Sequence, residues 1–286
     1  MIYIHNTGSL NLKEGDDFDV KAALKEATGK PFRRTDRFIQ MVLLGAYRAA
    51  GESKLDSETA LYMASGQGNL AVFNRLRDQQ YLLKQPPKPV DFINSLSNTA
   101  GFYAAQLLDL HGKNLNLTQH GFVVYMTLLL AQNDLHVGAQ EQVLVGGVDE
   151  LLEPISFTKK FLGICGDQPL GEGSNWMLLN RVEEGARAAL DVVTEAMDLA
   201  GVKAYLAEVD KRAKVAFGLR CSEAEIDSIT DGSERERFRY EQHCGFYETA
   251  ALYALIRFIE EEAGELIYIE QFERVFRLIR VRSLGR

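Results

Sequence analysis

Apolar runs that alternate with amphipathic stretches dominate the first half of the chain. Strand-like runs, apolar through most of their length, occur at MIYIHNTG (1–8), TALYMASGQGN (59–69), NLNLT (114–118) and EQVLVGGVDE (141–150). Apolar residues at helical spacing lie between them, at about 36–50, 70–79, 98–112 and 120–133, with Gly112 expected to close the third of these helices. Strands that are apolar throughout and alternate with helices predict an α/β fold with a largely parallel sheet covered by helices on both faces.

The pattern continues with more variation after residue 155. We expect strands at 176–182, 186–196, 214–219, 225–229, 265–270 and 275–281, and helices at 202–210 and 245–263. The basic segment 274–286 alternates with apolar residues, which indicates an edge strand with a solvated face. The chain is predicted to be one unit, 1–286, with an N-terminal half at 1–155 and a shortened C-terminal half at 156–286.

Composition narrows the class of protein. The chain has 286 residues and a formal net charge of −8, which is unlike the basic surface of a nucleic-acid-binding protein. The N-terminus lacks the pattern of a signal peptide, and no run approaches the roughly 20 apolar residues that span a bilayer. Cys165, Cys221 and Cys244 lie far apart and lack metal-ligand spacing. We therefore expect a cytoplasmic protein with no nucleic-acid partner, no membrane insertion, no metal and no cofactor.

The segment NLNLTQHGFVVYMTLL (114–129) predicts a short strand, a tight turn and a buried helix. Such an elbow presents a nucleophile at the edge of an α/β sheet, but this turn contains neither Ser nor Cys. Two glycine-containing segments follow. Gly146 and Gly147 are expected to end a strand where another element approaches closely, and PLGEGSNWMLLN (169–180) predicts a turn that enters a strand.

In this order and spacing, the segments GKNLNLT (112–118), VLVGGVDE (143–150) and PLGEG (169–173) resemble the β-ketoacyl synthases of the thiolase-like superfamily. The resemblance is specific from about residue 59 to residue 180. It implies a thiolase-like fold, with two mixed β-sheets and helices in an αβαβα layering, and with the C-terminal half reduced.

The departures from that family concern the residues that perform its chemistry. An ungapped alignment of the elbow helix places Gly121 where the family has its nucleophilic Cys, and a two-residue shift places Gln119 there instead. Neither side chain forms a thioester. The family's first catalytic His would fall in EIDSITDGSER (225–235), which has no imidazole, and His243 lies near the position of the second.

Within the superfamily the pattern resembles the chain-length factors, most closely the truncated ketosynthase-like subunits of type II aryl-polyene pathways. That resemblance implies a subunit without condensing activity of its own. It would pair with an active ketosynthase, which supplies Cys and both His residues, and would act on chains carried by an acyl carrier protein. The residues it implies for the shared tunnel and interface are Phe92, Ile93, Leu96, Phe102, Asn114, Leu115, Asn116, Leu117, Thr118, Gln119 and Phe122.

Other interpretations of these residues remain open. Gln119 and His243 would be the working pair of a malonyl-carrier-protein decarboxylase that makes a primer, and a homodimeric scaffold is a third possibility. Alternatively, Gln119 caps the elbow helix, His120 is held by backbone, His243 is a structural relic, and the apolar tunnel residues are ordinary core. Cys244 is expected to be a small buried hydrophobe.

Overall fold

The computed structural model describes residues 1–51, 55–164 and 168–285. Its strands are β1 (Ile2–Lys13), β2 (Ala60–Ser65), β3 (Asn114–Thr118), β4 (Gln142–Asp149), β5 (Gly171–Asn180), β6 (Ala188–Val192), β7 (Lys214–Phe217), β8 (Glu265–Phe272) and β9 (Val275–Ser283). Its helices are α1 (Val20–Thr28), α2 (Arg37–Ala50), α3 (Leu70–Tyr81), α4 (Pro89–Asn94), α5 (Ser97–Leu108), α6 (Val123–His136), α7 (Ile155–Leu162), α8 (Leu199–Glu208), α9 (Glu223–Thr230), the 3₁₀ turn η1 (Tyr240–Gln242) and α10 (Ala250–Glu261).

The strands form two sets with the same connectivity. The first set has the order β3-β2-β4-β5-β1 and the second the order β7-β8-β9-β6. In each set a parallel pair (β2 with β4, β7 with β8) is followed by two antiparallel neighbours. Within the part of the chain that the structure describes, the second set therefore repeats the first without a counterpart of β3. A short pairing of β1 with β6 joins the two sets into one continuous sheet.

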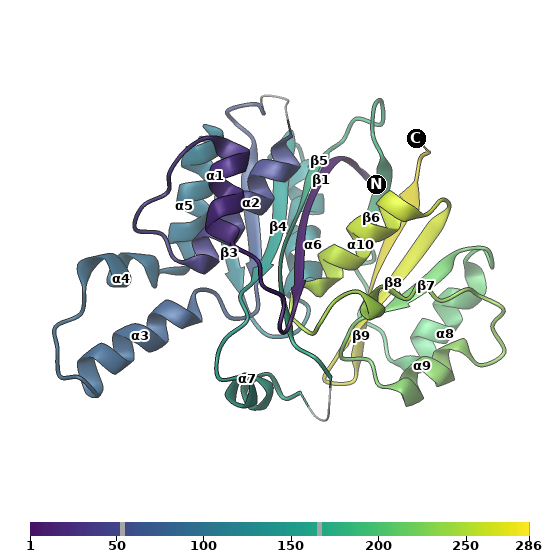
Figure 1. Ribbon diagram of the computed structural model, residues 1–286. Helices are drawn as coiled ribbons and strands as arrows, with labels where there is room; N and C mark the ends of the chain where they lie inside the picture. The colour runs from purple at the N-terminus through teal and green to yellow at the C-terminus, as the bar shows by residue number, and fades with distance from the viewer. Residues whose placement is uncertain (52–54, 165–167, 286) are drawn as a thin grey trace.

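Two central helices lie between the strand sets. One apolar cluster contains α6 and α10 together with inward side chains of both sets, such as Tyr62 and Tyr268. Helices α1, α2 and α5 cover the other face of the first set, and α8 and α9 cover the other face of the second. Figure 1 shows α6 and α10 beside the strands near the middle of the molecule. This arrangement confirms the αβαβα layering.

Glycines in β4 allow the layers to approach closely. A Cβ at Gly146 would lie 2.2 Å from the Trp176 ring, and one at Gly147 would lie 2.8 Å from the Thr249 Cβ. The expected close approach at these two glycines is confirmed, although β4 continues through both to Asp149 rather than ending there.

Three predicted elements were wrong, and each has a local cause. Residues 225–229 are helical, in α9, because Ser222 and Glu225 form a capping box. β9 is an interior strand between β6 and β8, and its Arg280 forms an ion pair with Glu265 at 2.5 Å instead of facing open solvent. α5 ends at Leu108 with Asp109 in the left-handed conformation, so that Gly112 does not close it.

Some helices also differ in extent from their prediction, and three helices, α1, α4 and α7, were not predicted. α10 begins at Ala250, five residues later than expected. α1 was missed because it is a surface helix in which only Val20 and Leu24 are buried, too few to give a clear helical period.

The two ends of the sheet differ in how they are covered. β7 forms one end, and its outer side is occupied by an irregular segment, since Val215 donates to the Glu236 carbonyl (2.9 Å) and accepts from the Phe238 amide (2.8 Å). β3 forms the other end. Within the described residues, no strand pairs with its outer side.

Candidate functional site

The elbow between β3 and α6 has the predicted strand–turn–helix form. Gln119 donates its backbone amide to the Ser65 carbonyl (3.2 Å), which prolongs the pairing of β3 with β2. Gly121 (φ 64°) and Phe122 (φ 53°) then adopt the left-handed conformation, and α6 begins at Val123. Because two left-handed residues precede the helix, it starts three residues later than the apolar pattern indicated.

Gly121 faces an aromatic ring instead of open space. A Cβ built on it would lie 2.3–2.6 Å from atoms of the Phe272 ring, so no larger side chain fits without displacement of that ring. Phe272 is the last residue of β8 and also contacts Phe122 edge-to-face, with ring centroids 6.1 Å apart. The Gln119 side chain is exposed and donates to the Gly121 carbonyl at 3.2 Å. Both positions remain predictions for the vacated nucleophile.

Beneath the turn lies an ion-pair network. The Glu248 carboxylate accepts a hydrogen bond from the Gly121 amide (3.3 Å), contacts His120 Nδ1 (3.4 Å) and forms an ion pair with Arg220. Desolvation pushes the pKa of Glu248 upward, but hydrogen bonds from His120 and Arg220 outweigh it and hold that pKa below its usual value. The hydrogen bond to Glu248 raises the pKa of His120.

A second buried carboxyl group, Asp149 at the end of β4, holds the start of the other central helix. It accepts hydrogen bonds from Ser65 Oγ (3.0 Å), the Gly66 amide (2.8 Å) and the Thr249 amide (2.9 Å). Burial and the nearby Glu248 charge raise its pKa to about 6. Burial and Glu248 likewise raise the pKa of Glu270, on β8, to about 8.

This region offers little room for a substrate. The cavity between Arg220, Glu248 and Glu270 measures about 20 Å³, which is space for one water molecule. A larger hollow of about 900 Å³ lies at the opposite ends of β2 and β4, lined by residues such as Thr59 and Gln142, and none of the predicted site residues lines it.

Several residues that the sequence suggested for a chemical role lie outside the Glu248 network. The His243 side chain is exposed, and its carbonyl accepts a hydrogen bond from Asn11 at 2.9 Å. Cys244 is buried, as predicted, and desolvation raises its pKa to about 12. Cys165 lies outside the described residues. Among the residues that are described, no group of three or more His, Cys, Asp or Glu side chains is placed to hold a metal ion.

The predicted tunnel residues are on the surface of the isolated chain. Phe92, Ile93, Leu96 and Phe102 are 60%, 52%, 48% and 62% exposed, respectively. These exposed fractions show that the four residues are not core residues of the chain by itself. The first three lie on α4 or just after it, and α3 and α4 project from the sheet on the left of Figure 1.

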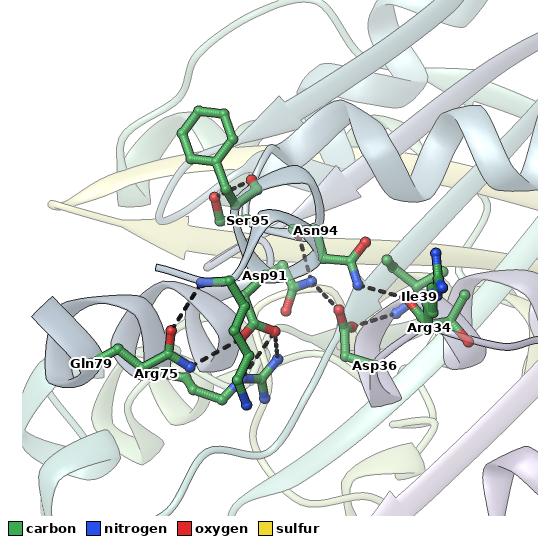
Figure 2. Close-up of polar contacts among 12 residues, drawn as sticks. Arg34, Asp36, Ile39, Arg75, Gln79, Asp91, Asn94 and Ser95 are labelled. Carbon is green, nitrogen blue, oxygen red and sulfur yellow. Dashed lines mark hydrogen bonds and ion pairs between the residues drawn. The ribbon is translucent and has the colours of Figure 1, made fainter. Parts of the chain in front are cut away.

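Buried polar contacts anchor the α4 segment (Figure 2). Asp91 is paired with Arg75 (2.9 Å) and accepts from Gln79 (3.1 Å), while Asn94 donates to the Arg34 carbonyl (2.9 Å). Desolvation acts to raise the pKa of Asp91, but the hydrogen bonds from Arg75 and Gln79 hold it below its ordinary value. Asp91 and Asn94 are buried while their apolar neighbours point outward, the reverse of an ordinary surface helix.

β3 presents backbone groups at its free edge. The Leu61 amide donates to the Lys113 carbonyl and the Gln119 amide donates to the Ser65 carbonyl, so odd-numbered residues of this segment face β2. The amides and carbonyls of Asn114, Asn116 and Thr118 therefore point away from the sheet. Leu115 and Leu117 are half-buried against the central apolar cluster.

Sequence reasoning missed the three charged residues that fill the site, Arg220, Glu248 and Glu270. Glu270 had a detectable signal, because it is an acid at the end of the apolar run LIYIE, where a strand runs into the interior. Arg220 and Glu248 lie 28 residues apart in the chain and become partners only through the fold.

Comparison with solved structures identifies the fold of the chain. No family model and no curated protein matches the chain. Solved structures match it along nearly its whole length. The ishigamide ketosynthase/chain length factor has a TM-score of 0.77 and 16% identity, covering 99% of each chain. A type II PKS acyl-carrier protein in complex with its ketosynthase has a TM-score of 0.68 and 11% identity, again with 99% of each chain covered.

A β-ketoacyl synthase from Burkholderia phymatum STM815 is similar at a TM-score of 0.67 and 13% identity, over 99% of each chain. The chain therefore has the thiolase-like fold of the ketosynthases. At these levels of identity the likeness establishes the fold, and the activity has to be argued from the site. No helix within the described ranges has the length and apolarity needed to cross a bilayer.

Proposed function

We propose that the chain is a ketosynthase-like subunit of the chain-length-factor kind, without condensing activity of its own. The observation that carries this proposal is the elbow: its turn keeps the strand-to-helix geometry, but Gly121 faces the Phe272 ring and offers no nucleophile. Condensation by this fold needs a side chain that accepts the acyl group and then releases it. The condensing residues would come from an active ketosynthase, in an aryl-polyene pathway of the type II polyketide or fatty-acid kind.

Pairing with that partner is proposed to run through β3 and the apolar surface beside it. β3 has a free edge with outward backbone groups, α5 packs against β3 and carries the exposed ring of Phe102, and α4 carries the exposed ring of Phe92. A large exposed apolar surface next to an unpaired strand is typical of a protein interface. In the complex these rings would form part of the wall of an acyl tunnel, whose substrate is carried by an acyl carrier protein.

Co-expression and co-purification with a candidate active ketosynthase test the pairing. Thr118→Pro removes an outward amide at the exposed end of β3 and leaves the pairing with β2 intact, so we expect it to weaken the 1:1 complex at least tenfold. Thr118→Val keeps the amide and should bind normally. Failure of the wild-type chain to form the complex, or equal binding by both variants, would contradict pairing through β3.

Product length tests the proposed tunnel wall. Phe92→Ala removes a ring from a surface that the partner would close, and longer acyl products are expected from the assembled complex because the closed cavity becomes larger. Mass spectrometry of the products measures this. Phe73→Ala, another exposed aromatic residue on α3, serves as the matched control. Release of CO2 from malonyl-carrier protein by the chain alone, abolished by Gln119→Ala, would instead support the decarboxylase.

A further inference from the structure

The start of α6 is occupied by side chains of the chain itself. The Gly121 amide donates to Glu248 at 3.3 Å, and the Phe122 amide acts to lower the pKa of the Glu270 carboxyl group. Unpaired amides at a helix N-terminus are the groups that bind a carbonyl, carboxylate or phosphate ligand. Here two internal carboxyl groups take that position.

Arg220 holds Glu248 in place. The two side chains form an ion pair in which Glu248 is 3% exposed and Arg220 is 20% exposed. The Arg220 guanidinium also lies over the rings of Phe246 (5.0 Å) and Phe272 (5.5 Å). A buried carboxylate fixed by a cation, an amide and an imidazole is strongly restrained, so it does not leave the helix terminus readily.

Phe272 occupies the remaining space. Its ring lies where a side chain at position 121 would begin, and it contacts Phe122. The cavity left beside Arg220 and Glu270 is about 20 Å³, which is space for about one water molecule. Glu270 is 9% exposed, and among the described residues its Oε2 atom has no hydrogen-bond partner. The polar groups here thus surround a filled site.

We propose that Glu248 is a built-in occupant of the α6 N-terminus, whose carboxylate stands in for the carbonyl or carboxylate group of a ligand, while the Phe272 ring fills the space beside Gly121. The start of α6 is thereby closed to acyl groups. This inference goes beyond the proposed function because it concerns the chain by itself. A failed complex with a ketosynthase would leave it intact.

Chemical rescue tests the occupant. Glu248→Ala removes the carboxylate and leaves Arg220 and the helix amides facing a hole of carboxylate size. Acetate, which has the chemistry of the missing group, should raise the melting temperature of this variant by about 2–4 °C at roughly 0.1 M, relative to sodium chloride of equal ionic strength. Wild type and Glu248→Gln, in which the site stays filled, should show no such gain. Equal melting temperatures of Glu248→Ala in the two salts, or an equal gain in wild type, would overturn the proposal.

A double-mutant cycle tests the steric part independently. Gly121→Ala should lower the urea midpoint strongly in the wild-type background, and clearly less in the Phe272→Ala background, because the ring that clashes is gone. The strain of the left-handed backbone is the same in both and cancels. Equal shifts in the two backgrounds would show that Phe272 does not fill this space. Should Gly121→Ala fail to fold, recovery of folded protein in the double variant is the expected result, and its absence would count against the proposal.

Discussion

The two strand sets differ most instructively where their central helices begin. α6, in the first half, has its Gly121 amide capped by Glu248, which comes from the second half. α10, in the second half, has its Thr249 amide capped by Asp149, which comes from the first. Each half therefore supplies the carboxyl group that satisfies the other's helix N-terminus, where a negative charge is favourable.

The two caps are stabilised by different means. Glu248 is ionised beside Arg220 and His120, and its pKa is lowered. Asp149 depends on neutral donors, namely one hydroxyl and two amides, and its pKa is raised to about 6. A buried ion pair is fragile because loss of one partner leaves an uncompensated charge, whereas a hydrogen-bonded carboxyl group can take up a proton. The α6 cap should therefore be the more sensitive of the two.

Removal of the cation is expected to have the largest effect. Arg220→Met leaves Glu248 buried without its counter-charge and should lower the free energy of unfolding by about 3–5 kcal/mol. Urea denaturation measures this. Arg181→Met breaks the exposed pair with Glu141 and should change stability by less than about 1 kcal/mol. Similar losses in both variants would show that the Arg220 pair is not specially important.

Asp149→Asn probes the other cap and should cost less, about 1–3 kcal/mol. An amide at this position keeps an acceptor for Gly66, but its NH2 group then faces the Thr249 amide, so one donor is left unsatisfied. The same urea experiment provides the comparison. A loss larger than that of Arg220→Met would reverse the predicted order of the two caps.

The smallest effect concerns pH. Glu270 has a folded-state pKa of about 8, well above the usual value of 4.5, so the folded chain holds a proton there that the unfolded chain has lost. Its contribution is fully present below about pH 4.5 and is lost as the pH rises to 8. Glu270→Gln, which cannot ionise, should reduce the fall in stability between pH 5 and pH 8 by at least about 1 kcal/mol. Parallel pH profiles for variant and wild type would mean that Glu270 titrates normally.

The fold was predictable from the sequence where burial is one-sided or complete. The runs that became β2, β4 and α2 are apolar because they are buried, and their positions were correct to within a few residues. Local chemistry decided the errors. The capping box at Ser222 made α9 helical against its β-branched composition, and two left-handed residues delayed the start of α6.

The site was predictable in position but not in content. The missing nucleophile was visible because the residues of the elbow are contiguous in the sequence. The surroundings of Gly121 form only after the two halves pack together, when Glu248, Arg220 and Phe272 come close to it. These contacts between distant residues cannot be inferred from a single sequence. The exposure of Phe92 and Phe102 could not be predicted either, because the sequence does not distinguish an apolar side chain that faces a core from one that faces a partner.

Among the described residues the second strand set has no counterpart of β3, and this also limits how copies or partners can join. The β7 end of the sheet is occupied by residues 236–238, so among the described strands only β3 has an edge that is free to accept another strand. A subunit with two free edges can polymerise without limit, but one with a single free edge stops after adding one neighbour. Edge-to-edge assembly of this chain with a second copy, or with a partner that also has one free edge, therefore ends at a pair.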